Sequence, residues 1–153
     1  MDEKRMEILA SLLMLPTYLQ LQDWQMEPLT PEVTVTLRAT QETPACPQCQ
    51  TPAHRIHSHY ERTLADLPWG NYRVCWKLTV RKCFCSNGDC EQRIFSERFT
   101  ELIKPWARKT SRLLEHLIAI GLALAGSAGA TLSAQLDLVA SRETLLRYVR
   151  PLP

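Results

Sequence analysis

Two short cysteine pairs, far apart in the chain, constrain its fold more than any other feature of the sequence. Cys46 and Cys49 form a CxxC motif, and Cys85 and Cys90 bound a tight, turn-rich loop much farther along. Structural zinc sites use four ligands in a tetrahedral arrangement, and each short loop can supply two thiolates. A β-hairpin between the loops would bring them together as a zinc ribbon. Because four thiolates leave no open coordination position, the sequence predicts one structural Zn²⁺.

A further thiol near the second loop is an alternative ligand. Cys83 lies close enough to replace Cys85, and we favour Cys85 because it bounds the turn directly. Regular alternation continued from Val80 would place Lys82 and Phe84, rather than Cys83, on the core side of the strand. The end of a ribbon is irregular, so this alternation leaves the alternative open.

Three histidines follow the first cysteine pair closely enough to ligate zinc. Their alternate spacing also suits a strand with polar side chains turned outward, which is the interpretation we favour. Ligation by a histidine stays open for His54, His57 and His59. A redox role for the CxxC motif is disfavoured, because no βαβ pattern surrounds it. Cys75 falls in the middle of an expected strand and is interpreted as a thiol without a metal.

Charge is distributed unevenly along the 153 residues. The net charge is −4 over residues 1–44 and +6 over residues 45–153. A basic body suits a polyanionic partner, although ordinary surface charge explains the same values. The longest apolar run, Leu113–Gly126, is shorter than the roughly 20 residues of a membrane span, and no secretory signal is visible. We therefore expect a cytoplasmic protein without a membrane partner, in which cysteines bind metal or stay free.

The hydrophobic pattern predicts an α+β fold in three segments. Residues 1–44 contain a helix over residues 3–15 and strands over residues 18–26 and 33–38. Residues 45–99 form the zinc-ribbon domain, in which residues 72–81 alternate strictly and pair with residues 54–64 through a turn at residues 68–71. Residues 100–153 are helical, and Pro105 suits a first helical position.

The end of the chain has the proportions of a helix-turn-helix. One short helix covers about residues 130–136, with Ala134 where the second helix crosses closely, and Ser141 is a suitable N-cap for that second helix. Cations and hydroxyls on its outward face and upstream of it are candidates to contact DNA phosphates or base edges. These candidates are Lys104, Arg108, Lys109, Arg112, Ser141, Arg142, Thr144 and Arg147. An ordinary helical hairpin with solvated basic residues fits the same periodicity.

The tryptophans are expected to serve a different purpose. No run of exposed aromatic residues accompanies Trp69, Trp76 or Trp106. We therefore expect these side chains to pack in the core rather than to stack on nucleic-acid bases.

Several motifs together resemble a known family. They are Cys46-Pro47-x-Cys49, His57-Ser58-x-Tyr60, Asp66-Leu67-Pro68, Arg81-Lys82, Cys85-x-Asn87-x-x-Cys90 followed by Phe95, and Ser141-Arg142-x-Thr144-Leu145-Leu146-Arg147. Over about residues 12–153 the sequence resembles the N-terminal zinc-ribbon and helix-turn-helix region of bacterial insertion-sequence transposases of the IS-L-three family. It departs from the family at Asp137, where many such turns carry glycine.

The resemblance implies binding to the terminal inverted repeats of a mobile element. In the family, a following domain with an acidic triad and divalent metals performs the transposition chemistry. No residues of this sequence match that triad, so the resemblance implies a truncated or separately encoded DNA-binding fragment that is not an enzyme by itself. Its expected partners are double-stranded DNA at the element ends, and a second copy or a full-length transposase.

A function of a different class is also open. The chain could be a zinc-ribbon adaptor or regulator whose helical tail binds a protein partner. A metal-dependent hydrolase is disfavoured, because no carboxylates and histidines are arranged around an open metal site.

Overall fold

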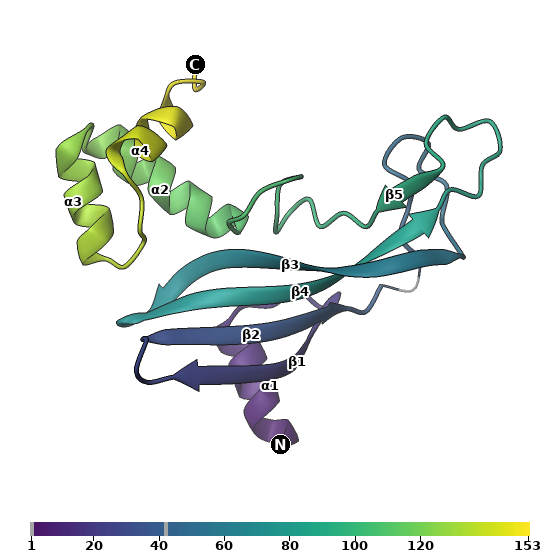
Figure 1. Ribbon diagram of the computed structural model, residues 1–153, viewed down its shortest axis with the longest axis horizontal. Coiled ribbons are helices and arrows are strands. Elements are labelled where there is room, and N and C mark those ends of the chain that lie inside the picture. The colour runs from purple at the N-terminus through teal and green to yellow at the C-terminus, as the bar shows by residue number, and fades with distance from the viewer. Residues whose placement is uncertain (1, 42) are drawn as a thin grey trace. The chain divides into compact units, whose positions relative to one another are not determined.

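The computed structural model describes residues 2–41 and 43–153 and confirms an α+β fold (Figure 1). In chain order the elements are α1 (Glu3–Leu12), β1 (Leu19–Glu27), β2 (Glu32–Ala39), β3 (Ile56–Trp69), β4 (Tyr72–Phe84), β5 (Ile94–Ser96), α2 (Ser111–Ala123), α3 (Ser127–Gln135) and α4 (Arg142–Val149). None of the helices in the described ranges combines the length and the apolar character that crossing a membrane requires.

The strands form one five-stranded sheet. Its order is β1-β2-β4-β3, and β5 pairs antiparallel with β4. Because β2 and β4 run in the same direction while β3 and β4 form a hairpin, the sheet is mixed (Figure 1). The N-terminal strands therefore pair with the hairpin that carries the cysteine loops.

The predicted alternation of β4 is confirmed along most of the strand. Val74, Trp76, Leu78 and Val80 are buried, as expected for one face of a pleated strand. The turn that precedes β4 is shorter than expected, because β3 continues to Trp69 and leaves only two residues outside the strands. The first of these is a glycine with φ of +54°, a conformation that costs glycine little.

The alternation changes phase near the end of β4. Cys83 is buried, whereas Lys82 and Phe84 are half-exposed, so the regular alternation does not continue to this end of the strand. Beyond Val80 the strand pairs with β5, with Cys83 opposite Phe95, and these two side chains belong to a separate small core. This core buries the opposite set of side chains, which a single uninterrupted alternation does not predict.

The chain folds into two compact units, and the long strands contribute to both. The first comprises Met1–Gln25, Val35–Thr63 and Trp76–Phe99, and the second comprises Met26–Thr34, Leu64–Cys75 and Thr100–Pro153. The cysteine loops belong to the first unit and α2 to α4 to the second. The division at residues 44/45 and 99/100 stays a prediction.

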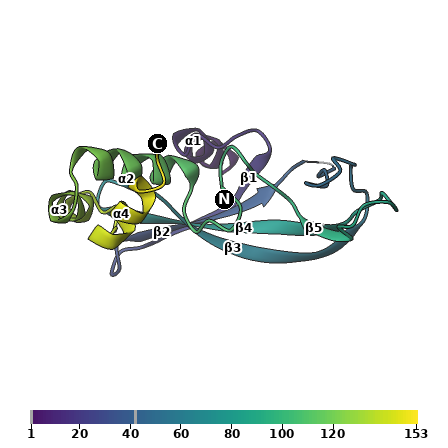
Figure 2. The ribbon, with the colours of Figure 1, turned by 90° about the horizontal axis from the view of Figure 1, so that it is seen from above.

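Three helices pack against one another in the second unit, and α2, α3 and α4 lie side by side in both views (Figures 1 and 2). Their core contains Leu113, Leu117, Leu138 and Leu145. Helix α2 begins at Ser111 rather than near Pro105, because the Thr110 side chain caps it by accepting a hydrogen bond from the Leu113 backbone N–H at 3.3 Å.

The turn between α3 and α4 contains an aspartate with a positive φ. Asp137 has φ of +55°, in the left-handed region that favours glycine. Aspartate tolerates this region better than most side chains.

Glycines, rather than Ala134, mark the close contacts of α4. Ala134 is exposed, so its expected place at the helix crossing was wrong. Both Gly121 of α2 and Gly129 of α3 are buried, and a Cβ added at Gly129 would overlap the Leu124 carbonyl oxygen and lie 3.1 Å from Leu145 Cδ1. Glycine is needed there because backbone and side chain occupy the space of any larger residue.

Gly129→Ala is therefore expected to destabilise the helical part of the chain by about 3 kcal/mol, the upper end of the usual cost of overpacking. The free energy of unfolding measured in urea would show the loss. Gly88→Ala is the matched control, because nothing lies within 4 Å of its added Cβ. Equal stabilities of the Gly129→Ala variant and the wild type would contradict the close packing of α3.

Candidate functional site

The four predicted cysteines converge to form one cluster. Cys46 Sγ lies 4.0 Å from Cys90 Sγ, Cys49 Sγ lies 3.5 Å from Cys85 Sγ, and all four sulfurs lie within 4.8 Å of one another. Four thiolates at about 2.3 Å from a tetrahedral zinc ion would be about 3.8 Å apart. The cluster therefore fits a closed, structural zinc site, with two ligands from each loop.

The first loop is shaped by its own backbone. The Gln50 N–H donates to the Cys46 carbonyl at 2.8 Å, and the Cys46 N–H donates to the Thr51 carbonyl at 3.0 Å. Gln50 adopts φ of +60°, which turns the chain sharply after the second cysteine. These bonds close a knuckle that presents Cys46 and Cys49 on the same side.

The second loop uses a side chain as well as the backbone. Asn87 Oδ1 accepts from the Asp89 N–H at 3.0 Å, and the Asn87 carbonyl accepts from the Cys90 N–H at 3.2 Å. At its base, the Cys85 N–H donates to the Arg93 carbonyl at 2.9 Å. An Asx-type turn therefore accommodates the wider spacing of this cysteine pair.

An ion pair at the edge of the ribbon holds the end of β4. Arg81 Nη2 donates to Glu97 Oε1 at 2.6 Å, and Arg81 Nε donates to Glu97 Oε2 at 3.1 Å. The same Nη2 also donates to the Gln41 carbonyl at 2.6 Å. Since Glu97 is buried, the pair fixes the segment after β5 next to the strand that leads to Cys85.

The local electrostatics favour a thiolate at one of the ligands. Thr51 Oγ1 lies 3.3 Å from Cys49 Sγ, and hydrogen bonds to the Thr51 side chain and backbone lower the pKa of Cys49 to about 6. A thiol with this pKa is mostly thiolate at neutral pH, which is the form that binds zinc. Burial raises the pKa of Cys90, so there a bound cation is needed to stabilise the thiolate.

The competing ligands lie outside the cluster. Among the described residues, the group close enough to share a metal contains Cys85 and not Cys83. Burial raises the pKa of the Cys83 thiol, which packs in the small core with Phe95 and Ala53. None of the three histidines joins the group, and the His57 ring makes an edge contact with Phe84, with 5.0 Å between ring centroids.

A family comparison agrees with this geometry. Residues 42–90 match the zinc-finger of transposase IS204/IS1001/IS1096/IS1165. This transposase zinc-finger match contains all four clustered cysteines and confirms the resemblance found in the sequence for this part of the chain. The match and the close cysteines together support a structural Zn²⁺. No curated protein and no solved structure matches the chain.

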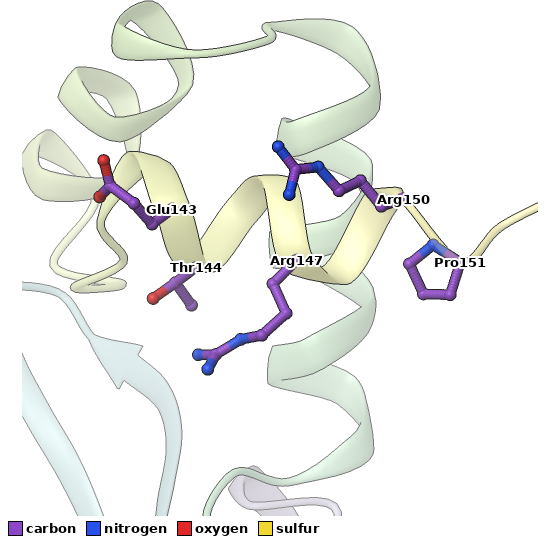
Figure 3. Close-up of a pocket in the computed structure, with 5 residues that line it drawn as sticks. All are labelled: Glu143, Thr144, Arg147, Arg150 and Pro151. Carbon is purple, nitrogen blue, oxygen red and sulfur yellow. The ribbon is translucent and has the colours of Figure 1, made fainter.

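The helical part lies beyond the transposase zinc-finger match, and its candidate residues are placed by the structure alone. An open hollow of about 770 Å³ lies on the outward face of α4, lined by Glu143, Thr144, Arg147, Arg150 and Pro151 (Figure 3). The side chains of Thr144 and Arg147 point to the same side of the helix. Arg150 was not among the sequence candidates, although its position three residues after Arg147 could have indicated it.

The start of α4 uses two of the candidate hydroxyls. Ser141 Oγ accepts from the Thr144 N–H at 3.2 Å, which confirms Ser141 as the N-cap. The Ser141 and Thr144 hydroxyls also lie 3.0 Å apart. Arg142 follows and is exposed. The capping contacts orient both hydroxyls at the end of the helix where anions are favoured.

The upstream candidates have different surroundings. Lys104 and Arg108 are exposed and Lys109 is half-buried, in the segment between β5 and α2. Arg112, by contrast, forms a bidentate ion pair with Asp66, with 2.8 Å between Arg112 Nε and Asp66 Oδ1. The guanidinium edge that would bind a phosphate is already occupied.

Asp66 has a structural role that the sequence analysis did not assign to it. Its side chain is fully buried, and Oδ1 also accepts from the Thr110 hydroxyl at 2.7 Å. Asp66 therefore binds both the N-cap of α2 and the first turn of that helix. The only signal in the sequence was its place in the Asp66-Leu67-Pro68 motif.

The three tryptophans predicted to pack in the core differ in their burial, and Trp69 is half-buried. Trp76 is fully buried, as expected, but Trp106 is 89% exposed, so its predicted place in the core was wrong. Trp106 lies in the turn-rich segment before α2.

Proposed function

We propose that this chain is the zinc-stabilised DNA-binding portion of an insertion-sequence transposase, and that it binds double-stranded DNA at the terminal repeats of the element. The observation that carries the proposal is the match of residues 42–90 to a transposase zinc finger. The exposed basic face of α4 supports it, because Arg147 and Arg150 line the hollow on that face.

In this proposal, α3 and α4 act as a helix-turn-helix and α4 lies in the major groove. Ser141, Thr144 and Arg147 are spaced by three residues, so they share one side of the helix and can reach the same stretch of DNA. An arginine can donate two hydrogen bonds to a guanine edge, and the hydroxyls suit phosphates or bases. Leu145 anchors the opposite side of α4 in the helical core.

The cations before α2 supply contacts to the DNA backbone. We assign this role to Lys104, Arg108 and Lys109, and to Arg142 at the start of α4, because their charges lie on the same compact unit as α4. We leave Arg112 out of this set, since breaking its pair with buried Asp66 would offset the gain from a phosphate contact.

Arg147→Gln is expected to weaken binding to duplexes that carry the element ends by about tenfold, within the usual range for one arginine contact to a base. A contact to phosphate would instead lower the salt dependence of log K by about one. Fluorescence anisotropy with labelled duplexes at several salt concentrations would measure both effects.

Arg5→Gln is the matched control for charge. Its side chain is 79% exposed on α1, outside the proposed interface. Binding that is absent at low salt, or equal loss of affinity for Arg5→Gln and Arg147→Gln, would contradict the proposal.

A second candidate function is binding to a protein. Ile8 and Leu12 are 54% and 69% exposed on α1 and, with Leu9, Arg5 and Trp24, line a mainly apolar hollow of about 190 Å³. An apolar contact of this kind would change little with salt, whereas binding to DNA weakens steeply as salt rises.

A further inference from the structure

Trp106 occupies the apex of a tight turn. The Ala107 N–H donates to the Lys104 carbonyl at 3.1 Å, which closes a four-residue turn with Pro105 in its second position and Trp106 in its third. Trp106 has φ of +64°. Proline at the second position and a positive φ at the third are the features of a type II turn.

Tryptophan is an unfavourable residue for this position. The third residue of a type II turn is usually glycine, because a Cβ is strained at positive φ. The indole is also 89% exposed, so burial in this chain does not compensate for the strain. Strained backbone positions cluster at active sites and ligand-binding sites, so this residue is a candidate for such a site.

The segments on both sides of the turn are held by hydrogen bonds and burial. Ile103 is buried, and the Ser111 N–H donates to the Leu102 carbonyl at 2.8 Å, which closes the segment on itself. The Ala65 N–H also donates to the Arg108 carbonyl at 2.9 Å. The indole is therefore presented at a defined place, which reduces the entropy lost when it binds a partner.

Charge around the turn indicates the chemistry of the partner. Lys104 and Arg108 flank the tryptophan on both sides and are exposed, and Lys109 follows. Glu101 is the one acidic residue between residues 100 and 110. An aromatic ring flanked by cations suits a nucleic acid, because the ring can stack on a base while the cations bind the neighbouring phosphates.

We propose that Trp106 stacks on a DNA base while Lys104 and Arg108 bind the adjoining phosphates, a site separate from the face of α4. The inference rests on the proposed DNA binding. It adds a residue that stacks on a base and makes no hydrogen bond to a base edge. The indole inserts at a base step of the duplex or stacks on an unpaired base. A segment of a protein partner covering the ring is the alternative that the experiment excludes.

The test compares Trp106→Gly with the wild type. Glycine removes the ring and relieves the strain at positive φ, so the variant is expected to be at least as stable as the wild type in thermal unfolding. Its affinity for an element-end duplex is expected to fall about tenfold, while its salt dependence stays unchanged because no charge is lost. Duplex binding is also expected to quench the emission of Trp106, and the variant should lose that part of the quenching.

Leu29→Ala is the matched control, since Leu29 is equally exposed at 89%. A duplex with one mismatch, compared with the perfect duplex and a single strand, distinguishes insertion at a base step from stacking on an unpaired base; preference for either supports the inference. Wild-type affinity and quenching in Trp106→Gly would overturn it while leaving the function of α4 intact. Failure of the wild type to bind any of the three DNAs would overturn both proposals.

Discussion

Replacing Cys46 or Cys90 with serine is expected to abolish zinc binding and to unfold the ribbon. Zinc binding contributes about 10–16 kcal/mol to the folding of isolated zinc-finger peptides, and removing one ligand loses much of this free energy. The small core beside the cluster contains few side chains besides the cysteines, chiefly Ala53 and Phe95. Burial of these residues cannot replace the metal.

Metal analysis of the purified protein and hydrogen exchange would test this expectation. The wild type should contain one zinc per chain, and both serine variants should contain none. Amide protection should disappear from the two cysteine loops and from β5. A chelator added to the wild type should produce the same pattern of exchange, because it removes the same ion.

Cys75→Ser provides the matched control. This cysteine is not one of the four whose sulfur atoms lie close enough to share a metal ion, so its replacement should leave the zinc content unchanged. If Cys46→Ser retained a full zinc content and wild-type thermal stability, the four-thiolate site would be refuted.

The metal cluster was predictable because its chemistry is local. Two short cysteine loops can each close on themselves, and zinc requires only that a hairpin join them. The alternation of β4 was predictable for a similar reason, since Val74 to Val80 follow one period against one core. The residues within each cysteine pair and along the alternating strand are neighbours in sequence.

The predictions that failed depend on contacts distant in sequence. Cys83 is buried because β5 returns to pair with it, and Gly129, rather than Ala134, lies at the helix crossing because Leu124 and Leu145 meet it there. Trp106 is exposed because a turn places it outside the sheet and helices. Hydrophobic character by itself does not say which core, if any, will receive a side chain.

One buried carboxylate helps to hold the start of α2. Asp66 accepts from the Thr110 hydroxyl, which in turn accepts from the Leu113 N–H, so the N-cap is fixed to β3. Arg112 neutralises the charge from the first turn of the same helix. Truncating or neutralising one partner leaves the other charge uncompensated in a site that excludes most water.

Asp66→Asn is therefore expected to destabilise the protein by about 3 kcal/mol, within the range for breaking a buried ion pair. Urea unfolding of Asp66→Asn, Arg112→Gln and the double variant would give the coupling energy between the two residues, which is expected to exceed 1 kcal/mol for groups in direct contact. Arg5→Gln is the control, because its pair with Asp2 is exposed and should contribute less than about 1 kcal/mol. Additive effects of Asp66→Asn and Arg112→Gln would show that the carboxylate does not hold α2 through this arginine.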